Sequence, residues 1–116
     1  MPKQFRLPMI LVHTPFLWVE GLTLFPWVFC KDANPPKWLL NHERIHLRQQ
    51  IELGIFLFYG WYLIEYLVRL IQYRRHYLAY RNISFEREAY GNDKNLAYLE
   101  TRKAWAFWKY LRESSK

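Results

Sequence analysis

Twelve consecutive uncharged residues, LGIFLFYGWYLI (53–64), constrain the fold of this chain more than any other feature. Removing so much apolar surface from water is strongly favourable, so protein or lipid should cover the segment. It falls short of the roughly 20 apolar residues that a membrane-spanning helix needs, and Glu52, Glu65 and Arg69 bound or interrupt it. We therefore predict a buried helix that runs to about Tyr73; the alternative is a helix embedded in a membrane or resting on one.

Length and charge limit the class of protein and of partner. The chain has 116 residues, 52% of them hydrophobic, which fits one domain with a modest core. Its formal charge of +7 favours an anionic partner such as an anionic membrane surface, and a soluble basic domain is the plain alternative. The sequence contains no nucleic-acid-binding motif that would support nucleic acid as the partner. It leaves the oligomeric state open.

Cysteine content and the first residues bear on the location of the protein. The single cysteine, Cys30, cannot form an intramolecular disulfide, which fits the reducing cytoplasm. The start, MPKQFRLPMILVH, combines basic residues with a short apolar run, as a signal peptide does. However, His13, Pro15 and Glu20 interrupt the run, and no small-residue cleavage site follows. We predict a cytoplasmic protein without a cleavable signal peptide and leave membrane association open.

Strand character is confined to residues 16–31, FLWVEGLTLFPWVFCK, which are rich in aromatic and β-branched residues. The dipeptide Glu20-Gly21 is the turn signal, and it predicts a short hairpin whose second strand covers about 22–30. Pro26 has no N–H to donate, so that strand should lie at a sheet edge or contain a bulge. Residues 1–14 look irregular.

The rest of the chain is predicted to be helical, which makes the fold class α+β and mostly helical. Asn34 as N-cap and Pro35 at the first helical position indicate a helix over 36–52 that bends or ends near Gly54. The apolar helix described above follows and should back this first helix.

Two further helices are expected after a polar, basic connection, QYRRHYLAYRN (72–82). The first begins near Asn82 or Ser84, where Ser-x-x-Arg forms a partial capping box, and runs to about Leu99 with a break at Gly91-Asn92. The second covers 100–116 as an amphipathic helix. Residues 35–99 would then form the helical core of a single domain, 1–116.

His42, Glu43 and His46 form the pattern His-Glu-x-x-His on the predicted first helix. At 3.6 residues per turn, the two imidazoles project from the same side about one turn apart, so both can reach one zinc ion. Glu43 lies about 100° round the helix, where it can take a proton from a water at that ion and later deliver it to a leaving amine. The plain alternative is a pair of ordinary surface histidines.

A catalytic zinc site needs a third protein ligand and one open position. His13 and His76 are candidates, although neither has a predicted helical placement. The segment ISFEREAYGND offers Glu86 or Glu88 on a later helix, and Ala89 would let that helix approach the first one closely. A solvated surface acid is the alternative interpretation of Glu86.

The segments NHERIH and FEREA together resemble the gluzincin metallopeptidases, which pair His-Glu-x-x-His with a glutamate on a later helix. The pattern Phe-Glu-x-x-Ala-Asp of a membrane-associated gluzincin family aligns best. The chain also resembles the minimal soluble minigluzincins and a group of small uncharacterised bacterial proteins related to them. The resemblance covers roughly 22–98. It implies a zinc-dependent metallopeptidase in which His42, His46 and Glu86 bind Zn²⁺ and Glu43 is the catalytic base and acid.

The resemblance also implies how substrate binds and what regulates the site. In gluzincins, an edge strand beside the active-site helix holds a peptide or protein substrate in extended form, and the 22–30 strand would do so here. Minimal members occur in self-inhibited forms, so residues 1–15 would be a covering arm. Tyr90 stands where the family has an aspartate that supports a ligand histidine, and Asn92 or Asp93 are the alternatives for that support.

Three side chains are candidates for supporting the metal ligands or stabilising an oxyanion: Tyr90, Gln49 and Tyr80. Trp105 and Trp108 share one face of the predicted C-terminal helix between basic residues, a pattern typical of core packing or of an anionic membrane interface. Because Tyr90 carries no charge, the alternative to an enzyme is a catalytically inactive gluzincin-like scaffold that binds a membrane surface or a protein.

Overall fold

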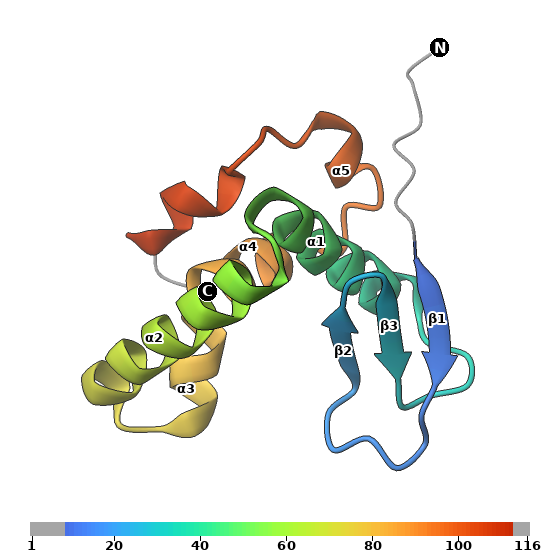
Figure 1. Cartoon of the computed structure of the whole chain (residues 1–116), viewed down its shortest axis with the longest axis horizontal. Coiled ribbons are helices and arrows are strands. Elements are labelled where there is room, and N and C mark those ends of the chain that lie inside the picture. Colours follow the sequence, from blue (N-terminus) through green and yellow to red (C-terminus); the bar gives the residue numbers. More distant parts are fainter. Residues whose placement is uncertain (1–8, 113–116) are drawn as a thin grey trace.

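Three short strands lie beside the first long helix in the computed structural model, which describes residues 9–112 (Figure 1). The strands are β1 (Ile10–His13), β2 (Gly21–Leu24) and β3 (Trp27–Cys30), in the sheet order β1-β3-β2. β1 runs parallel and β2 antiparallel to β3. The edge strand β2 packs against α1 (Lys37–Leu53). The fold is α+β and mostly helical, as predicted.

The predicted hairpin is present, but its turn is wrong. Phe25 and Pro26 form the turn between β2 and β3, where a proline needs no N–H donor, and the Pro26 carbonyl accepts from the Ile10 N–H at 2.8 Å. The predicted single strand over 22–30 is therefore two strands. β1 lies in the part predicted to be irregular. Residues 10–13 have no clear strand pattern, and their pairing with β3 makes them a strand.

The predicted covering arm is wrong for its described part, 9–15. β1 pairs with β3 on the side away from β2, so it extends the far edge of the sheet and does not cover the helix that carries the histidines (Figure 1). Residues 1–8 of that predicted arm lie outside the described part of the chain.

α1 ends where predicted, at Gly54, whose positive φ of 84° is a conformation that glycine adopts without a Cβ penalty. The predicted N-cap, Asn34, is wrong, because Pro36 is the N-cap and no side chain caps the helix. The Asn34 N–H instead donates to the Asp32 carboxylate at 3.1 Å.

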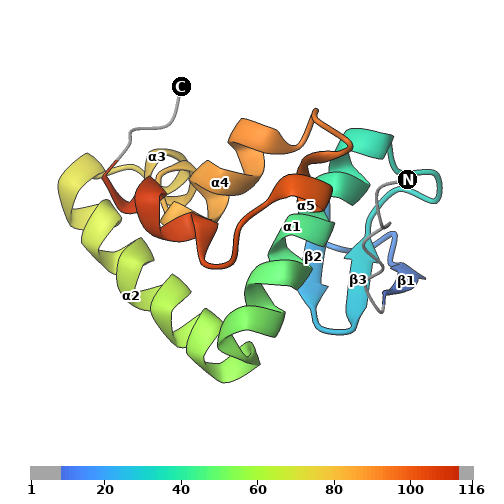
Figure 2. The ribbon, with the colours of Figure 1, turned by 90° about the horizontal axis from the view of Figure 1, so that it is seen from above.

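The apolar helix is α2 (Ile55–Tyr73), and the prediction that it is buried is wrong. Only Phe58 and Glu65 of its residues are buried. α2 runs along the outside of the molecule, and the rest of the chain covers one side of it (Figure 2). A chain of this length has too few other helices to cover a second side.

The C-terminal half contains α3 (His76–Arg81), α4 (Ser84–Asn92), α5 (Tyr98–Thr101) and the 3₁₀ helix η1 (Ala106–Leu111). α3 replaces the predicted connection, and α4 ends at the predicted break instead of continuing to Leu99. Ser84 is not the N-cap of α4. Its N–H and Oγ both donate to the Glu65 carboxylate at 2.6 Å, so an acid from α2 occupies the positive end of α4.

The predicted amphipathic helix over 100–116 is wrong within its described residues, because only α5 and η1 are helical there. Phe107 is fully buried against Phe85, and the Arg87 guanidinium donates to the Tyr110 and Leu111 carbonyls. These tertiary contacts hold a tight 3₁₀ turn in place of a regular helix. Residues 113–116 lie outside the described part.

Two apolar clusters stabilise this arrangement. One joins α2 to α4 and η1 through Phe58, Ile83, Phe85 and Phe107, and the other joins β3 to α1 through buried residues that include Val28 and Leu47. α1 and α4 therefore pack side by side between the sheet and α2, which places the histidines of one helix opposite the acids of the other.

Candidate metal centre

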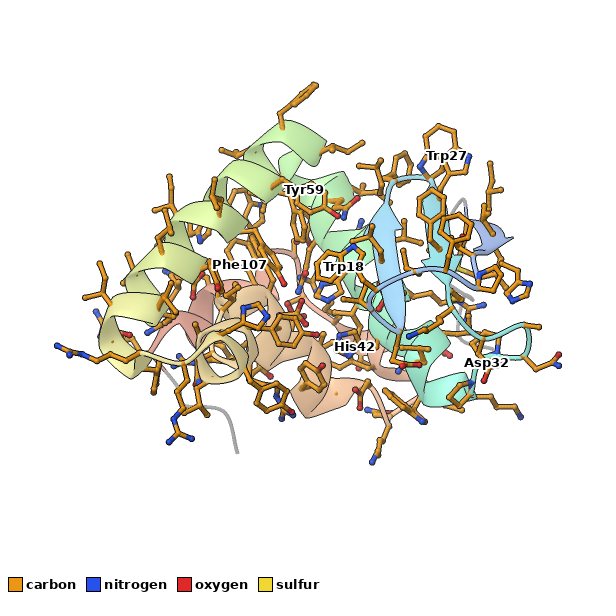
Figure 3. The ribbon with its side chains drawn as sticks, turned by 90° about the horizontal axis from the view of Figure 1, so that it is seen from below. Trp18, Trp27, Asp32, His42, Tyr59 and Phe107 are labelled. Carbon is orange, nitrogen blue, oxygen red and sulfur yellow. The ribbon has the colours of Figure 1, made fainter. Side chains whose placement is uncertain are left out.

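His42 and His46 lie one turn apart on α1, as the four-residue spacing predicts, and the Nε2 atoms of both face Glu86 of α4. Figure 3 shows the position of His42. Glu86 in the first turn of α4 points back at them. Its Oε1 atom lies 3.1 Å from His42 Nε2 and 3.2 Å from His46 Nε2. Two ligand atoms on a tetrahedral zinc-sized ion lie about 3.3 Å apart, given metal–ligand bonds of about 2.0–2.1 Å. All three ligand atoms lie within 4.8 Å of one another, so these side chains could share one metal ion.

All three side chains are buried, with 3–5% of each residue exposed. Within residues 9–112, they form the one group of three metal-binding side chains whose ligand atoms converge. The alternative ligands considered from the sequence lie elsewhere. His13 is on β1, His76 contacts Tyr66 at 2.8 Å, and Glu88 binds Arg102.

Each histidine uses its other ring nitrogen to contact a fixed acceptor. His42 Nδ1 lies 3.0 Å from Asp93 Oδ2, and His46 Nδ1 lies 2.9 Å from Gln49 Oε1. Acceptors at both Nδ1 atoms favour the tautomer with Nδ1 protonated, which leaves the Nε2 lone pairs free for a metal. Gln49 therefore orients the His46 ring, as its predicted support of a metal ligand would require.

Asp93, and not Tyr90, contacts His42 Nδ1. It sits just after α4, where Asn41 Nδ2 donates to the Asp93 carbonyl at 2.8 Å and to the Asn95 carbonyl at 3.0 Å. Asn41 immediately precedes the histidine motif, so the same helix that carries the ligands also fixes the loop that orients one of them. The sequence named Asp93 as an alternative, but it gave no signal for Asn41.

Tyr80 and Tyr90 contact each other and not the ligand nitrogens. Their hydroxyls lie 2.7 Å apart, and the Tyr90 ring packs edge-on against the His42 ring with centroids 4.5 Å apart. The Arg81 guanidinium carbon lies 3.8 Å from the centre of the Tyr90 ring. Tyr90 thus supports His42 by packing, and its missing charge is supplied by Asp93.

Tyr62 completes the set of contacts around Glu86, and the sequence analysis did not identify it. Its hydroxyl donates to Glu86 Oε2 at 2.7 Å, so the carboxylate presents Oε1 to the histidines. Burial and the nearby Glu86 charge raise the pKa of Tyr62, which keeps the hydroxyl protonated as a donor. Tyr62 lies on the inner side of α2, seven residues after Ile55, where periodicity alone indicates only packing.

The acidic side chains around His42 and His46 would stabilise a positive charge at the site. Burial alone would lower the pKa of His42, but hydrogen bonds to Asp93 and Glu86 raise it to about 10. Burial also opposes charge on His46, but the Glu86 carboxylate raises its pKa. Burial would raise the pKa of Glu86, yet the two histidines lower it. Protons on the imidazoles therefore balance the acids when no metal is bound, and a divalent ion would displace them.

Glu43 lies on the β2 side of α1 and does not contact the ligand atoms. Thr23 Oγ1 donates to Glu43 Oε1 at 2.6 Å. Gly21 lets β2 approach α1 closely, because a Cβ atom at this position would lie 2.8 Å from Glu43 Oε2. The carboxylate is 4% exposed, and its charge still contributes to the pKa of both histidines. Glu43 is thus held near the histidines by a strand and is available as a base.

The outward edge of β2 is partly covered. In an antiparallel pair, every second residue directs its backbone N–H and carbonyl to the partner strand, and the residues between direct theirs away. The Lys31 N–H donates to the Glu20 carbonyl, so the backbone groups of Gly21 and Thr23 point away from β3. The Thr23 carbonyl accepts from Gln50 Nε2 at 2.9 Å and from the Tyr59 hydroxyl, and Gln50 Oε1 accepts from the Phe25 N–H at 2.7 Å. Among the described residues, an added strand could pair most readily beside Gly21.

Comparisons with protein-family models, with curated proteins and with solved structures found no significant match to this chain. The chemistry that the site can support therefore follows from its own geometry. Two nitrogens and one carboxylate oxygen, each oriented by a further hydrogen bond, form a donor set that could hold a divalent metal ion.

Replacing Asp93 by asparagine is expected to weaken metal binding about 10–100-fold. The amide keeps the shape of the side chain but removes the charge that makes His42 a better ligand. A competition titration with a chromogenic chelator measures the change. The matched control is Asp32→Asn, because the exposed Asp32 contacts the Asn34 backbone away from the site. Equal affinities for wild type and Asp93→Asn would exclude this role of Asp93.

Proposed function

We propose that this protein is a zinc-dependent metallopeptidase that hydrolyses peptide bonds. The observation that carries the proposal is the convergence of His42 Nε2, His46 Nε2 and Glu86 Oε1. A second carboxylate that is not a ligand, that of Glu43, lies nearby on the helix that carries the histidines. Three ligands of nitrogen and oxygen that leave one position open are typical of catalytic zinc sites. The donor set alone does not exclude another divalent metal, so zinc is part of the proposal.

The ion would be held by His42, His46 and Glu86, and when bound it would lower the pKa of a water molecule to about 7 and polarise the scissile carbonyl. Glu43 would accept the proton of the attacking water and return it to the leaving amine. Thr23 would fix the Glu43 carboxylate in one orientation through Oε1. Asp93 and Gln49 would keep both imidazoles in the required tautomer.

The substrate would be a peptide in extended form that pairs with the outward edge of β2. Main-chain hydrogen bonds to a strand edge give affinity without demanding a particular sequence. Alternation along the hairpin turns the N–H and the carbonyl of Gly21 away from β3, so both could pair with an approaching backbone. Because Gln50 and Tyr59 already occupy the Thr23 carbonyl, pairing should be centred on Gly21.

The test is cleavage of a blocked peptide library, followed by mass spectrometry, with the zinc-loaded protein. We expect cleavage that stops after removal of metal by a chelator and returns when zinc is added. Cleavage that persists after complete removal of metal would contradict the proposal, as would a fully zinc-loaded protein that cleaves none of the peptides.

A zinc-binding scaffold without activity is the second candidate, and one observation favours it. The ligands and Glu43 are each at most 5% exposed, so substrate has little open surface at the site. This candidate predicts that zinc binds and stabilises the protein, while no peptide is cleaved under any metal loading.

A further inference from the structure

The outward face of α2 is an exposed apolar surface on a helix that is otherwise packed. Offsets of three, four and seven residues place its large side chains in one stripe. Phe56 is 94% exposed, Ile71 77% and Ile64 66%. At 1.5 Å per residue, the 19 residues of α2 extend about 28 Å. The exposed members of the stripe are Phe56, Leu57, Leu63, Ile64, Leu67, Val68 and Ile71.

A row of exposed large apolar side chains on one helix face is typical of a surface that contacts a protein or a membrane. Within the described residues, α2 is also the one helix that is long and apolar enough to cross a bilayer, with 17% of its most apolar window buried. The core helix of a soluble protein can be equally long and apolar, but other elements cover it on most sides. In α2 only Phe58 and Glu65 are buried, and the outward face is exposed.

The inner side of α2 is committed to the rest of the protein. Tyr62 donates to Glu86, and Glu65 accepts from the Ser84 N–H and hydroxyl at the start of α4. A helix that crossed a membrane alone would have to break these contacts and expose the buried Glu65 to lipid. α2 would therefore lie along a surface and not span it.

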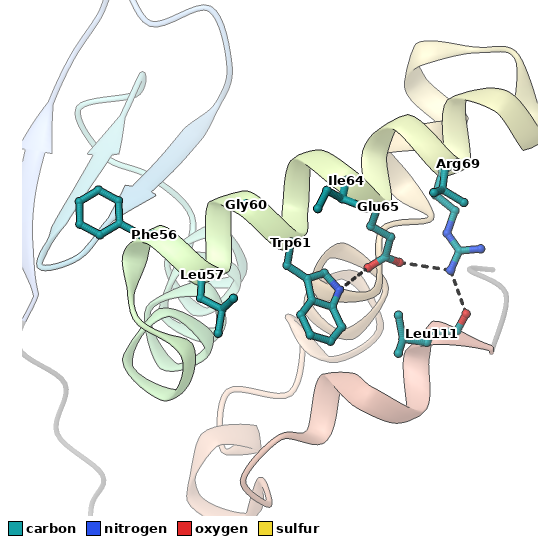
Figure 4. A pocket seen from close by; sticks show the side chains of 9 residues that line it. Phe56, Leu57, Gly60, Trp61, Ile64, Glu65, Arg69 and Leu111 are labelled. Carbon is teal, nitrogen blue, oxygen red and sulfur yellow. Dashed lines mark hydrogen bonds and ion pairs between the residues drawn. The ribbon is translucent and has the colours of Figure 1, made fainter.

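An apolar groove runs beside the stripe, between α2 and η1 (Figure 4). Its volume is about 460 Å³, and its apolar lining includes Leu57, Ile64, Val68 and Leu111. Most polar groups in its wall are paired, although Arg69 Nε has no hydrogen-bond partner among the described residues. Figure 4 shows that Glu65 accepts from Trp61 Nε1 at 3.2 Å and from Arg69 Nη2 at 3.2 Å. The groove thus offers hydrocarbon contacts and few free hydrogen-bonding groups.

Positive charge borders this apolar face. Arg74 and Arg75 are exposed immediately after α2, and Lys109 and Arg112 are exposed on η1 and just after it, next to Leu111 of the groove wall. Glu65 is the sole acid in α2, and it is buried. The face therefore combines exposed hydrocarbon with a cationic border and without an exposed acid from its own helix.

Trp108 lies at the same border and is 58% exposed. Its ring packs edge-on against Trp61, with centroids 5.8 Å apart. Tryptophan at the boundary between an apolar face and a cationic border is typical of membrane–water interfaces.

We propose that the outward face of α2, with the groove beside it, rests in the surface of an anionic lipid bilayer. The apolar stripe and groove contact the acyl chains, while the four bordering cations contact anionic headgroups. Binding by a second copy is less favourable, because a two-fold interface would bring the same cationic borders together with no exposed acid on α2 to pair with them. This inference does not depend on the proposed peptidase activity.

The test is flotation of the full-length protein with vesicles of phosphatidylcholine alone or mixed with phosphatidylglycerol. We expect wild type to bind the mixed vesicles more strongly. Ile64→Ser combined with Ile71→Ser should weaken that binding more than about tenfold, because both side chains lose their transfer into hydrocarbon. Arg74→Ser combined with Arg75→Ser should remove much of the preference for anionic vesicles.

The matched control is Phe16→Ser combined with Leu96→Ser, which removes two exposed apolar side chains outside α2. It should bind vesicles as wild type does. Unchanged thermal unfolding of every variant in the absence of lipid shows that the fold is retained. Equal vesicle binding by wild type and the α2 variant would overturn the proposal, as would wild type that floats with neither vesicle. A wild-type dimer that the α2 substitutions convert to a monomer, without lipid binding, would assign the face to a second copy and also overturn it.

Discussion

The Glu43→Gln variant is expected to keep its bound metal and to cleave peptides about 10²-fold to 10⁴-fold more slowly than wild type. Glutamine has nearly the same shape and can still accept the hydrogen bond from Thr23 Oγ1 through its amide oxygen. It cannot take a proton from water at neutral pH. Because Glu43 contacts none of the ligand atoms, the histidines and Glu86 should still hold the ion.

The measurement is the initial rate of cleavage of one library peptide at equal metal loading. Glu100→Gln is the matched control, since Glu100 is an exposed acid on α5 away from the site. It should cleave at the wild-type rate. A Glu43→Gln variant that is as active as wild type would remove Glu43 from the mechanism. A variant that is inactive only because its metal is lost would show that Glu43 has a structural role instead.

The Arg102→Met variant is expected to lower the free energy of unfolding by about 3–5 kcal/mol. Arg102 lies between two acids, with Nη1 2.7 Å from Glu52 Oε2 and Nη2 3.1 Å from Glu88 Oε1. The Glu88 side chain is fully buried and that of Arg102 is 1% exposed. Removing the guanidinium leaves the buried Glu88 carboxylate without a balancing charge, and such a charge cannot be rehydrated without opening the fold.

Urea-induced unfolding of the metal-free protein measures this change. Lys103→Met is the matched control, because Lys103 is exposed one residue away, and it should change stability by less than about 0.5 kcal/mol. Adding Glu88→Gln to Arg102→Met should restore part of the loss, since the amide carries no charge and its one oxygen can still accept from either Gln49 or Tyr98. A double variant less stable than Arg102→Met would contradict the explanation by unpaired charge.

The ligand positions were predictable because they depend on short-range geometry and on one packing relation. A four-residue spacing fixes the relative direction of His42 and His46 on any helix, whatever surrounds it. To bring Glu86 to the histidines, a second helix had only to pack beside the first. The family resemblance and the small side chain of Ala89 predicted that packing. The structure brings these three side chains together as expected.

The supporting residues could not be assigned, because their partners come from distant segments. Asp93 reaches His42 only because Asn41 holds the loop after α4, and Tyr62 reaches Glu86 from α2. No local pattern specifies such contacts. The same reason explains Glu65: its ion pair with Arg69 follows from the four-residue spacing on one helix, but its contacts with Ser84 depend on how α2 and α4 pack.

The end of the chain shows how tertiary contacts override local pattern. The segment after Leu99 has the composition of an amphipathic helix, yet Phe107 enters the core and Arg87 binds two carbonyls near its end. α2 shows the converse. Its apolar sequence correctly predicts a helix, but exposure depends on how much protein is left to cover it, and periodicity contains no information about that.

Metal content of the purified protein, measured by inductively coupled plasma mass spectrometry, tests the central claim most directly. We expect about one zinc ion per chain in wild type after incubation with zinc and dialysis, and almost none in His46→Ala or Glu86→Gln, each of which removes one of three ligands. His76→Ala, which changes a histidine away from the site, should retain the wild-type content. Wild type without bound metal, or equal metal in wild type and His46→Ala, would contradict the assignment of this site.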